Sequence, residues 1–273
     1  LGEPTPFNAD LTILTNFHDE EAKARAEKEL KEKGAIATPS RSSYFGIIDL
    51  AGFPKDRYWL YKSRWSSEPV LHLIPHWNWP GREGKITPVQ AYTNCAEAEL
   101  FVNGKSYGRK AKGANEYRFL WDNVVYEPGT VKVVGKTADG KTIESAVATS
   151  GSPAKILMAR EYGSGPSTEF GGDCAPARSR TYSSEDIVFV DVKVADRDGN
   201  MVPTASDRLR FSVSGPGEIV AVDAGDATCH TPFRSDEIKA FGGLASVIVR
   251  RTSPGTVILR AESEGLEAGE TEL

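Results

Sequence analysis

The sequence has few of the residues that mark metal centres and disulfide frameworks. Among 273 residues there are three cysteines and four histidines. Cys95, Cys174 and Cys229 show no C-x-x-C spacing, so a structural zinc site is not supported. Cys174 and Cys229 could pair in a secreted protein, but unpaired, partly buried thiols are the favoured interpretation. We expect no metal and no cofactor.

The chain also lacks a surplus of positive charge, a membrane-spanning run and a leader. Its net charge of −5 argues against a nucleic-acid partner, which would require a basic face. No apolar run approaches the roughly 18 to 20 residues that span a bilayer. No charged-then-apolar leader is visible either. Because the first residue is Leu1 rather than methionine, we expect the chain to have been trimmed or cut from something longer.

Residues 1–66 differ in pattern from the rest of the chain. Residues 19–33 predict a surface helix, with acids in the first turn, lysines in the last and Gly34 at the C-terminal cap. Residues 39–65 predict a long loop that leads into a short helix beginning at Pro54. These elements are too few to build a core, so the segment must pack on something else.

The short helix carries aromatic residues spaced three and four apart, which places them on one face. We expect the apolar face of this segment to be covered by polypeptide outside this numbering. Its residues are Phe45, Ile47, Leu50, Tyr58, Tyr61 and Trp65.

From Glu68 onward the hydrophobic pattern has a period of two, which is typical of strands. The Asn103-Gly104 dipeptide predicts a two-residue hairpin. Two strand series, separated by a linker at 150–153, predict immunoglobulin-like β-sandwiches at 67–152 and 153–273. The predicted strands are 70–74, 89–93, 99–102, 116–121, 130–136 and 143–149 in the first, and 155–159, 187–195, 209–214, 219–222, 245–250 and 257–261 in the second.

Acid–base catalysis needs paired carboxylates, or a histidine beside a nucleophile, and no convincing set stands out. Asp49 and Asp56 are interpreted as capping or ion-pairing residues. Glu3 is less easily assigned to such a structural role, because neighbouring prolines hold it in an irregular segment. The D-A-G-D-A-T segment at 223–228 lacks the spaced acids of a calcium loop and predicts a polar turn.

Two aromatic and two imidazole side chains gather in H-L-I-P-H-W-N-W. His72 and His76 would not converge on a metal, because the strand is interrupted by Pro75. Trp77 and Trp79 could stack on a sugar ring, or could pack the N-terminal segment against the first sandwich. Packing is the favoured alternative, since tryptophans usually bury most of their area.

Four segments together resemble the C-terminal portion of glycoside hydrolase family 2 enzymes, in the β-galactosidase-like branch common in gut Bacteroidetes. L-G-E-P-T-P-F-N (1–8) resembles the end of the eighth barrel strand, and S-Y-F-G-I-I-D-L-A-G-F-P-K-D-R-Y-W-L-Y (43–61) resembles the loop and helix that follow it. H-W-N-W-P-G (76–81) resembles the start of the sandwich after the barrel. V-S-G-P-G-E-I-V-A-V-D-A-G-D (213–226) resembles the core motif of the last sandwich.

The resemblance implies a mainly β chain in which residues 1–66 close a (β/α)8 barrel whose body lies upstream. The family's two catalytic glutamates match no position here. Glu3, Tyr44 and Phe45 would lie at the rim of the sugar pocket. Tyr44 and Phe45 fall near the place where the family's β-glucuronidases carry an Asn and a Lys, which favours a neutral galactoside.

Several further expectations follow from the resemblance. The partners would be a carbohydrate substrate and the upstream catalytic barrel, with a homo-oligomer possible. The compartment would be the periplasm or the exterior. The alternative hypothesis is a glycan-binding or structural sandwich array without enzymatic activity, in which Trp77 and Trp79 would bind the glycan.

Overall fold

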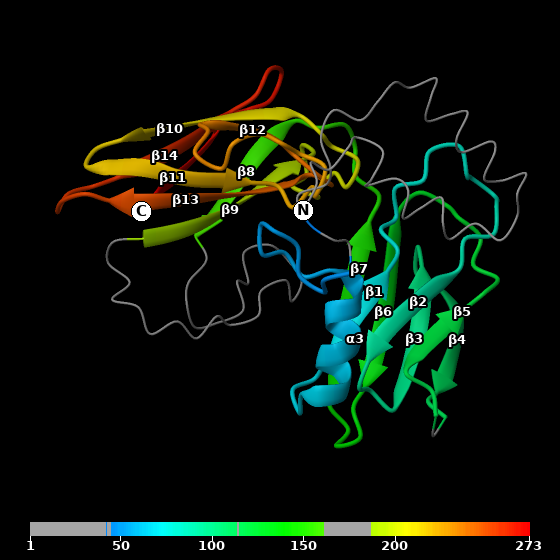
Figure 1. Cartoon of the computed structure of the whole chain (residues 1–273). Helices are drawn as coiled ribbons and strands as arrows, with labels where there is room; N and C mark the ends of the chain where they lie inside the picture. The colour runs from blue at the N-terminus through cyan, green and yellow to red at the C-terminus, as the bar shows by residue number, and fades with distance from the viewer. Residues whose placement is uncertain (1–41, 43–44, 114, 161–186) are drawn as a thin grey trace, which may run out of the picture. The chain divides into compact units, whose positions relative to one another are not determined.

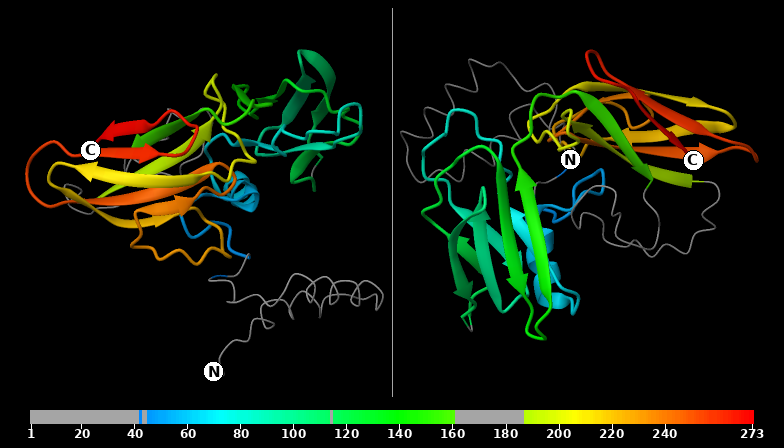
Figure 2. Two further views of the ribbon diagram at one scale, coloured as in Figure 1. Left: turned by 90° about the horizontal axis from the view of Figure 1, so that it is seen from above. Right: turned by 180° about the vertical axis from the view of Figure 1, so that it is seen from behind.

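The computed structural model describes residues 42, 45–113, 115–160 and 187–273. This part of the chain consists of one helix, α3 (Asp56–Trp65), followed by fifteen strands (Figures 1 and 2). The helix predicted at 19–33 lies outside the described residues. The helix predicted from Pro54 is confirmed and begins at Asp56.

The first sandwich is made of seven strands in two antiparallel sheets. Its strands are β1 (Leu71–Ile74), β2 (Val89–Thr93), β3 (Glu97–Val102), β4 (Lys105–Ala111), β5 (Arg118–Trp121), β6 (Thr130–Lys136) and β7 (Thr142–Ala148). One sheet has the order β1-β2-β5 and the other has the order β4-β3-β6-β7. β1, which directly follows α3 in the chain, is an end strand of the three-stranded sheet.

The turn between β3 and β4 has the predicted hairpin geometry. Asn103 has a φ of 50° and Gly104 a φ of 81°. Positive φ at both central residues is what a type I′ turn requires, and asparagine and glycine adopt it at least cost. Val102 pairs with Lys105 across the turn.

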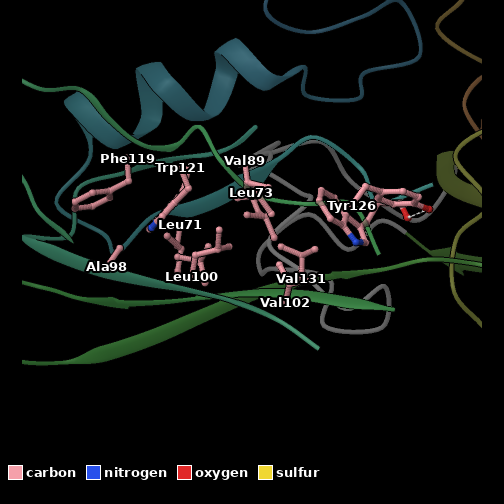
Figure 3. Close-up of a cluster of buried hydrophobic side chains, with 14 residues drawn as sticks. Leu71, Leu73, Val89, Ala98, Leu100, Val102, Phe119, Trp121, Tyr126 and Val131 are labelled. Atoms are coloured by element: carbon pink, nitrogen blue, oxygen red, sulfur yellow. Dashed lines mark hydrogen bonds between the residues drawn. The ribbon is translucent and has the colours of Figure 1, made fainter. Parts of the chain in front are cut away.

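The core of the first sandwich lies between the two sheets and is built from alternate residues of β1, β2, β3, β5 and β6, together with Trp77, Val124 and Tyr126 from the segments between strands (Figure 3). Val131 and Val133 of β6 and Leu100 of β3 have no exposed area. Trp77 and Tyr126 meet edge to face in this core, with ring centroids 5.0 Å apart. The predicted period of two is confirmed.

The second sandwich is made of eight strands, again in two antiparallel sheets. Its strands are β8 (Lys155–Arg160), β9 (Ile187–Ala195), β10 (Arg208–Ser214), β11 (Gly217–Asp223), β12 (Glu237–Lys239), β13 (Leu244–Arg251), β14 (Ile258–Glu262) and β15 (Gly269–Glu272). The sheet orders are β11-β13-β9-β8 and β12-β10-β14-β15. Two β-sandwiches, as predicted, make up nearly all of the described chain.

The strand β9 shows how strictly the sequence pattern determines this core. Val188, Val190, Val192 and Val194 are all buried, at 6% exposure or less. The residues between them are on the other face and partly exposed. Because side chains alternate along a strand, four valines at every second position define one buried face.

Two strands of the second sandwich, β12 and β15, were not predicted. β12 is only three residues long, E-I-K, and β15 is G-E-T-E. The buried residue of β15 is Gly269, where a side chain would meet the carbonyl oxygen of Ile156. An apolar residue is therefore excluded at the position where the alternation would have revealed the strand.

Two cysteines are described, and both are free thiols. Cys95 is buried and Cys229 is partly exposed, while Cys174 lies outside the described residues. Within the described ranges, no helix has the length and apolar character needed to cross a bilayer.

Side chains on both sides fix the linker between the sandwiches. Asn78 accepts a hydrogen bond from Ser150 N at 3.0 Å and donates one to Ser150 Oγ at 2.7 Å. Gly151 N donates to the Asp196 carboxylate at 2.8 Å. The linker predicted at 150–153 is therefore held by specific polar contacts.

Asp196 is the central acceptor of this linker and is only 4% exposed. Its carboxylate also accepts hydrogen bonds from Asp198 N at 3.0 Å and Asn200 N at 2.9 Å. Burial alone would raise the pKa of Asp196, but the N–H donors of Gly151, Asn200 and Asp198 outweigh burial and lower it.

We predict that Asp196→Asn lowers the free energy of unfolding by about 1–3 kcal/mol at pH 7, because an amide group leaves at least one of these donors without an acceptor. Since the folded-state pKa lies below the ordinary 3.8, the carboxylate stabilises the fold above that pH and ceases to do so as pH falls through the folded value. Urea unfolding should therefore show a difference in the free energy of unfolding between wild type and Asp196→Asn that becomes smaller as the pH falls.

The matched control for this measurement is Asp198→Asn, whose side chain is exposed. It should change the unfolding free energy by less than about 0.5 kcal/mol. Equal effects of the two substitutions on the unfolding free energy at pH 7 would contradict the role of Asp196 as the acceptor that holds the linker.

Candidate functional site

The loop that precedes α3 is folded back on itself by short hydrogen bonds. Asp49 N donates to Phe53 O at 3.0 Å, and Lys55 N donates to Ile47 O at 2.9 Å. The Asp49 carboxylate accepts a further bond from Phe53 N at 2.9 Å. Asp49 therefore caps its own loop, as its sequence interpretation predicted.

The Asp49 carboxylate also lies against the turn that follows β11. Burial raises the pKa of Asp49, backbone N–H groups oppose the rise, and the neighbouring Asp223 carboxylate adds to it. Gly225 has a φ of 80°, and a Cβ there would overlap the Asp49 carboxylate. Glycine is thus required at this point both by its backbone conformation and by the approach of Asp49.

The predicted polar turn at 223–228 is confirmed. Gly225 N donates to Asp223 Oδ1 at 2.6 Å. Thr228 N and Thr228 Oγ1 both donate to Asp226 Oδ1, at 2.8 and 2.7 Å. These carboxylates are used by their own turns, which is the local hydrogen bonding that aspartate favours.

The predicted rim residues are only partly described. Glu3 and Tyr44 lie outside the described residues. Phe45 is described and is 87% exposed. An exposed aromatic ring is compatible with a ligand-facing role, and the assignment of these three residues stays a prediction.

α3 packs on the outer face of the β1-β2-β5 sheet, opposite the core of the first sandwich (Figure 3). Trp59 is its buried anchor, at 4% exposure, and stacks on His72 of β1 with ring centroids 5.1 Å apart. Asp56 Oδ1 lies 2.9 Å from His72 Nε2. Asp56 therefore fixes the imidazole against which Trp59 stacks, a structural role of the kind that the sequence interpretation gave it.

α3 packs on the sheet through a different face from the aromatic one that its spacing defines, and the cover of that aromatic face by polypeptide outside this numbering stays a prediction. Trp59 and Ser63 are buried, whereas Tyr61 is 38% and Trp65 79% exposed. Tyr61 and Trp65 lie side by side, with centroids 4.9 Å apart. α3 thus has apolar rings on two sides, and one side has no cover within the described residues.

The two tryptophans of H-W-N-W occupy packed positions. Trp77 is 1% exposed, and its Nε1 donates to Glu127 O at 2.9 Å. Trp79 is half-buried, stacks on His76 at 4.3 Å between centroids and donates to His76 O at 2.8 Å. Trp77 offers no open ring face to a sugar, and its partner is the sandwich core rather than the N-terminal segment.

The two histidines face different partners, as their spacing across Pro75 suggested. His72 contacts Trp59 and Asp56, while His76 Nδ1 accepts a hydrogen bond from Asn78 N at 3.2 Å. Burial lowers the pKa of His76, against the opposing charge of Asp56. A neutral imidazole suits its acceptor role.

A groove that the sequence analysis missed lies on the first sandwich, between β4 and β5. It has a volume of about 590 Å³, and its lining includes Lys110, Glu116, Tyr117, Arg118 and Asp122. The sequence signal was Tyr117, an aromatic residue two positions before Phe119. Alternation alone would place Tyr117 on the core side with Phe119 and Trp121, but β5 begins only at Arg118, and Tyr117 is 43% exposed.

Comparison with known families matches both sandwiches. Residues 176–272 match glycoside hydrolase family 2 C-terminal domain 5. Residues 84–144 match a domain of unknown function, DUF4982. The two matches lie in the second and the first sandwich respectively.

Similar proteins of known name and structure agree with these matches. The chain is 42% identical over 231 residues to the β-galactosidase BoGH2A of Bacteroides ovatus, covering 84% of this chain and 25% of that protein. It is 28% identical to a β-glucuronidase of Formosa agariphila, covering 81% of this chain and 21% of that protein. A β-glycosidase structure from Bacteroides vulgatus superposes with a TM-score of 0.75 at 30% identity, covering 88% of this chain and 29% of that one.

The two sandwiches and these matches define the chain as a pair of C-terminal β-sandwich domains. They are domains of the kind found in glycoside hydrolase family 2, whose C-terminal domain model the second sandwich matches. The chain spans about a quarter of the length of the curated relatives it matches.

We predict that Trp59→Ala lowers the free energy of unfolding by about 3–5 kcal/mol, because it removes a buried indole and leaves a cavity against His72. Hydrogen exchange of the α3 amides should accelerate in this variant. Trp65→Ala, at a far more exposed position of the same helix, should stay within about 0.5 kcal/mol of the wild type. A larger loss for Trp65→Ala than for Trp59→Ala would mean that the packed face is misassigned.

Proposed function

We propose that this chain is the C-terminal part of a retaining β-glycosidase that hydrolyses β-galactosides, and that it is inactive alone. The higher identity to a named β-galactosidase than to a named β-glucuronidase supports the galactoside. The aromatic Phe45, in a segment that resembles the pocket rim, supports a neutral sugar in place of a uronic acid. The chain would supply part of this rim and a scaffold of two sandwiches.

The catalytic pair would come from the part of the parent protein that precedes this chain. Retaining hydrolysis needs two carboxyl groups about 5 to 5.5 Å apart, one as acid/base and one as nucleophile. The described acids nearest to α3 already have structural partners: Asp49 caps its loop and Asp56 holds His72. A carboxylate engaged in this way is a poor candidate for either role.

The observation that carries the proposal is the uncovered pair Tyr61 and Trp65 on α3. Each helix of a (β/α)8 barrel buries one face against the barrel strands. α3 already uses its Trp59 face on the first sandwich, so the opposite face would be the one that meets an upstream barrel. One helix would then join barrel and sandwich through its two apolar sides.

The residues first considered for the rival hypothesis, a non-enzymatic glycan-binding array, do not favour it. It relied on Trp77 and Trp79 as sugar platforms, and Trp77 is buried in the core. A periplasmic or extracellular location and a homo-oligomeric parent are further parts of the proposal, supported by family resemblance. Cell fractionation and sedimentation of the parent protein would test them.

We predict that the 273-residue chain hydrolyses nitrophenyl β-galactoside and nitrophenyl β-glucuronide no faster than buffer. The parent protein from the same reading frame should hydrolyse the galactoside with a kcat/KM at least about tenfold above that for the glucuronide. Turnover by the chain itself would place the catalytic pair inside it. A preference of the parent for the glucuronide would overturn the substrate assignment and leave the reaction class standing.

We predict that Trp65→Ser is neutral in this chain but destabilising in the parent. A ring that is 79% exposed here loses little on truncation. If an upstream barrel covers it, truncation in the parent should cost about 2–4 kcal/mol and lower the melting temperature. Arg57→Ser, at an exposed charged position of the same helix, is the control and should be neutral in both proteins. Equal behaviour of Trp65→Ser in chain and parent would rule out this docking face.

A further inference from the structure

The groove between β4 and β5 has the size and the edges of a ligand site. β4 ends one sheet of the first sandwich and β5 ends the other, so the groove lies along one open side of the sandwich. Its volume of about 590 Å³ falls in the usual range of small-ligand sites, roughly 300 to 1,000 Å³. The groove lies entirely within this one sandwich.

Tyr117 gives the groove a flat apolar surface. Tyr117 is 43% exposed, and the guanidinium of Arg118 lies 5.2 Å from its ring centroid. A cation stacked on an aromatic ring restrains both side chains. The exposed part of the ring is a platform of the kind that packs against the C–H face of a pyranose.

The polar groups around this platform are held in place before any ligand arrives. Lys110 Nζ donates to Leu120 O across the strand edge. Arg118 donates to Gln90 Oε1 at 2.7 Å, and Glu116 Oε2 accepts from Gly113 N at 2.8 Å. An ammonium has three N–H donors and a guanidinium five, so each keeps donors for a ligand. Fixed polar groups reduce the entropy that binding would otherwise cost.

The charges of the groove balance. Lys110 and Arg118 supply two positive charges, and Glu116 and Asp122 supply two negative charges. Such a lining offers both donors and acceptors without net attraction for an anion. A polyanion, which requires a basic track, is therefore disfavoured. A neutral ligand rich in hydroxyl groups, each both donor and acceptor, fits the lining.

We propose that the groove between β4 and β5 binds a neutral oligosaccharide, with one sugar ring stacked on Tyr117 and its hydroxyl groups hydrogen-bonded to Arg118 and Glu116. This site would bind glycan without cleaving it, and so goes beyond the proposed hydrolytic function. Because the binding is measured on this chain alone, its success or failure is independent of whether the parent hydrolyses galactosides.

The experiment is a calorimetric and NMR titration of the full 273-residue chain with four neutral tetrasaccharides, namely β-1,4-galactotetraose, cellotetraose, xylotetraose and mannotetraose. Tetragalacturonate is the charged comparison. We expect at least one neutral probe to bind, with chemical-shift changes centred on residues 110–122, and to bind more tightly than tetragalacturonate. Tyr117→Ala should weaken that binding about two- to tenfold, the range expected for loss of one aromatic stacking contact.

Two further variants control the test. Tyr117→Phe keeps the ring and should retain most of the affinity, which separates stacking from a folding defect. Tyr61→Ala removes a ring of similar exposure on α3 and should leave binding unchanged. The proposal is overturned if no neutral probe binds up to about 10 mM, if tetragalacturonate binds best, or if Tyr117→Ala binds as the wild type does.

Discussion

The stacking of Trp59 on His72 anchors α3 on the first sandwich. It commits one side of α3 to the outer face of the β1-β2-β5 sheet and thereby makes that sheet a middle layer, with α3 above and the sandwich core below (Figure 3). Asp56 orients the imidazole from the first turn of the same helix. The exposed position of Tyr61 and Trp65 follows from this choice of face, because a helix cannot turn both sides to one sheet.

A second constraint recurs where segments meet: a carboxylate or amide accepts backbone N–H groups. Asp196 does so for the linker, Asp49 for the loop before α3, and Asn78 for Ser150. Buried N–H groups must find acceptors, and short polar side chains provide them where no strand can. Asp196 is buried and Asp49 is partly buried, and the pKa of the first is lowered while that of the second is raised. Shifted pKa values are also a mark of catalytic acids. The several backbone partners of Asp196 and Asp49 show that these two acids hold structure.

Much of the fold could be predicted from alternation alone. The four valines of β9 and the Asn103-Gly104 turn each follow from a local rule that tertiary contacts do not override. β12 and β15 could not be predicted, since three- and four-residue strands carry too few apolar positions to show a period. The face through which α3 packs on the sheet could not be predicted, because Trp59 lies between the spaced aromatic residues and spacing alone does not say which side meets a sheet.

The candidate sites also show that sequence spacing does not determine which aromatic side chains are exposed. Trp77 and Tyr117 are both aromatic residues beside polar neighbours. The sequence analysis considered only Trp77 as a sugar platform, with packing as the favoured alternative. The structure agrees with packing, since Trp77 is 1% exposed, and it leaves Tyr117 43% exposed. The difference arises at the start of β5: Phe119 and Trp121 fill its core positions, whereas Tyr117, which has the same parity, lies just before the strand begins at Arg118. A ring left outside at the edge of a sandwich, among fixed and balanced charges, is available to a ligand in a way that a core tryptophan cannot be.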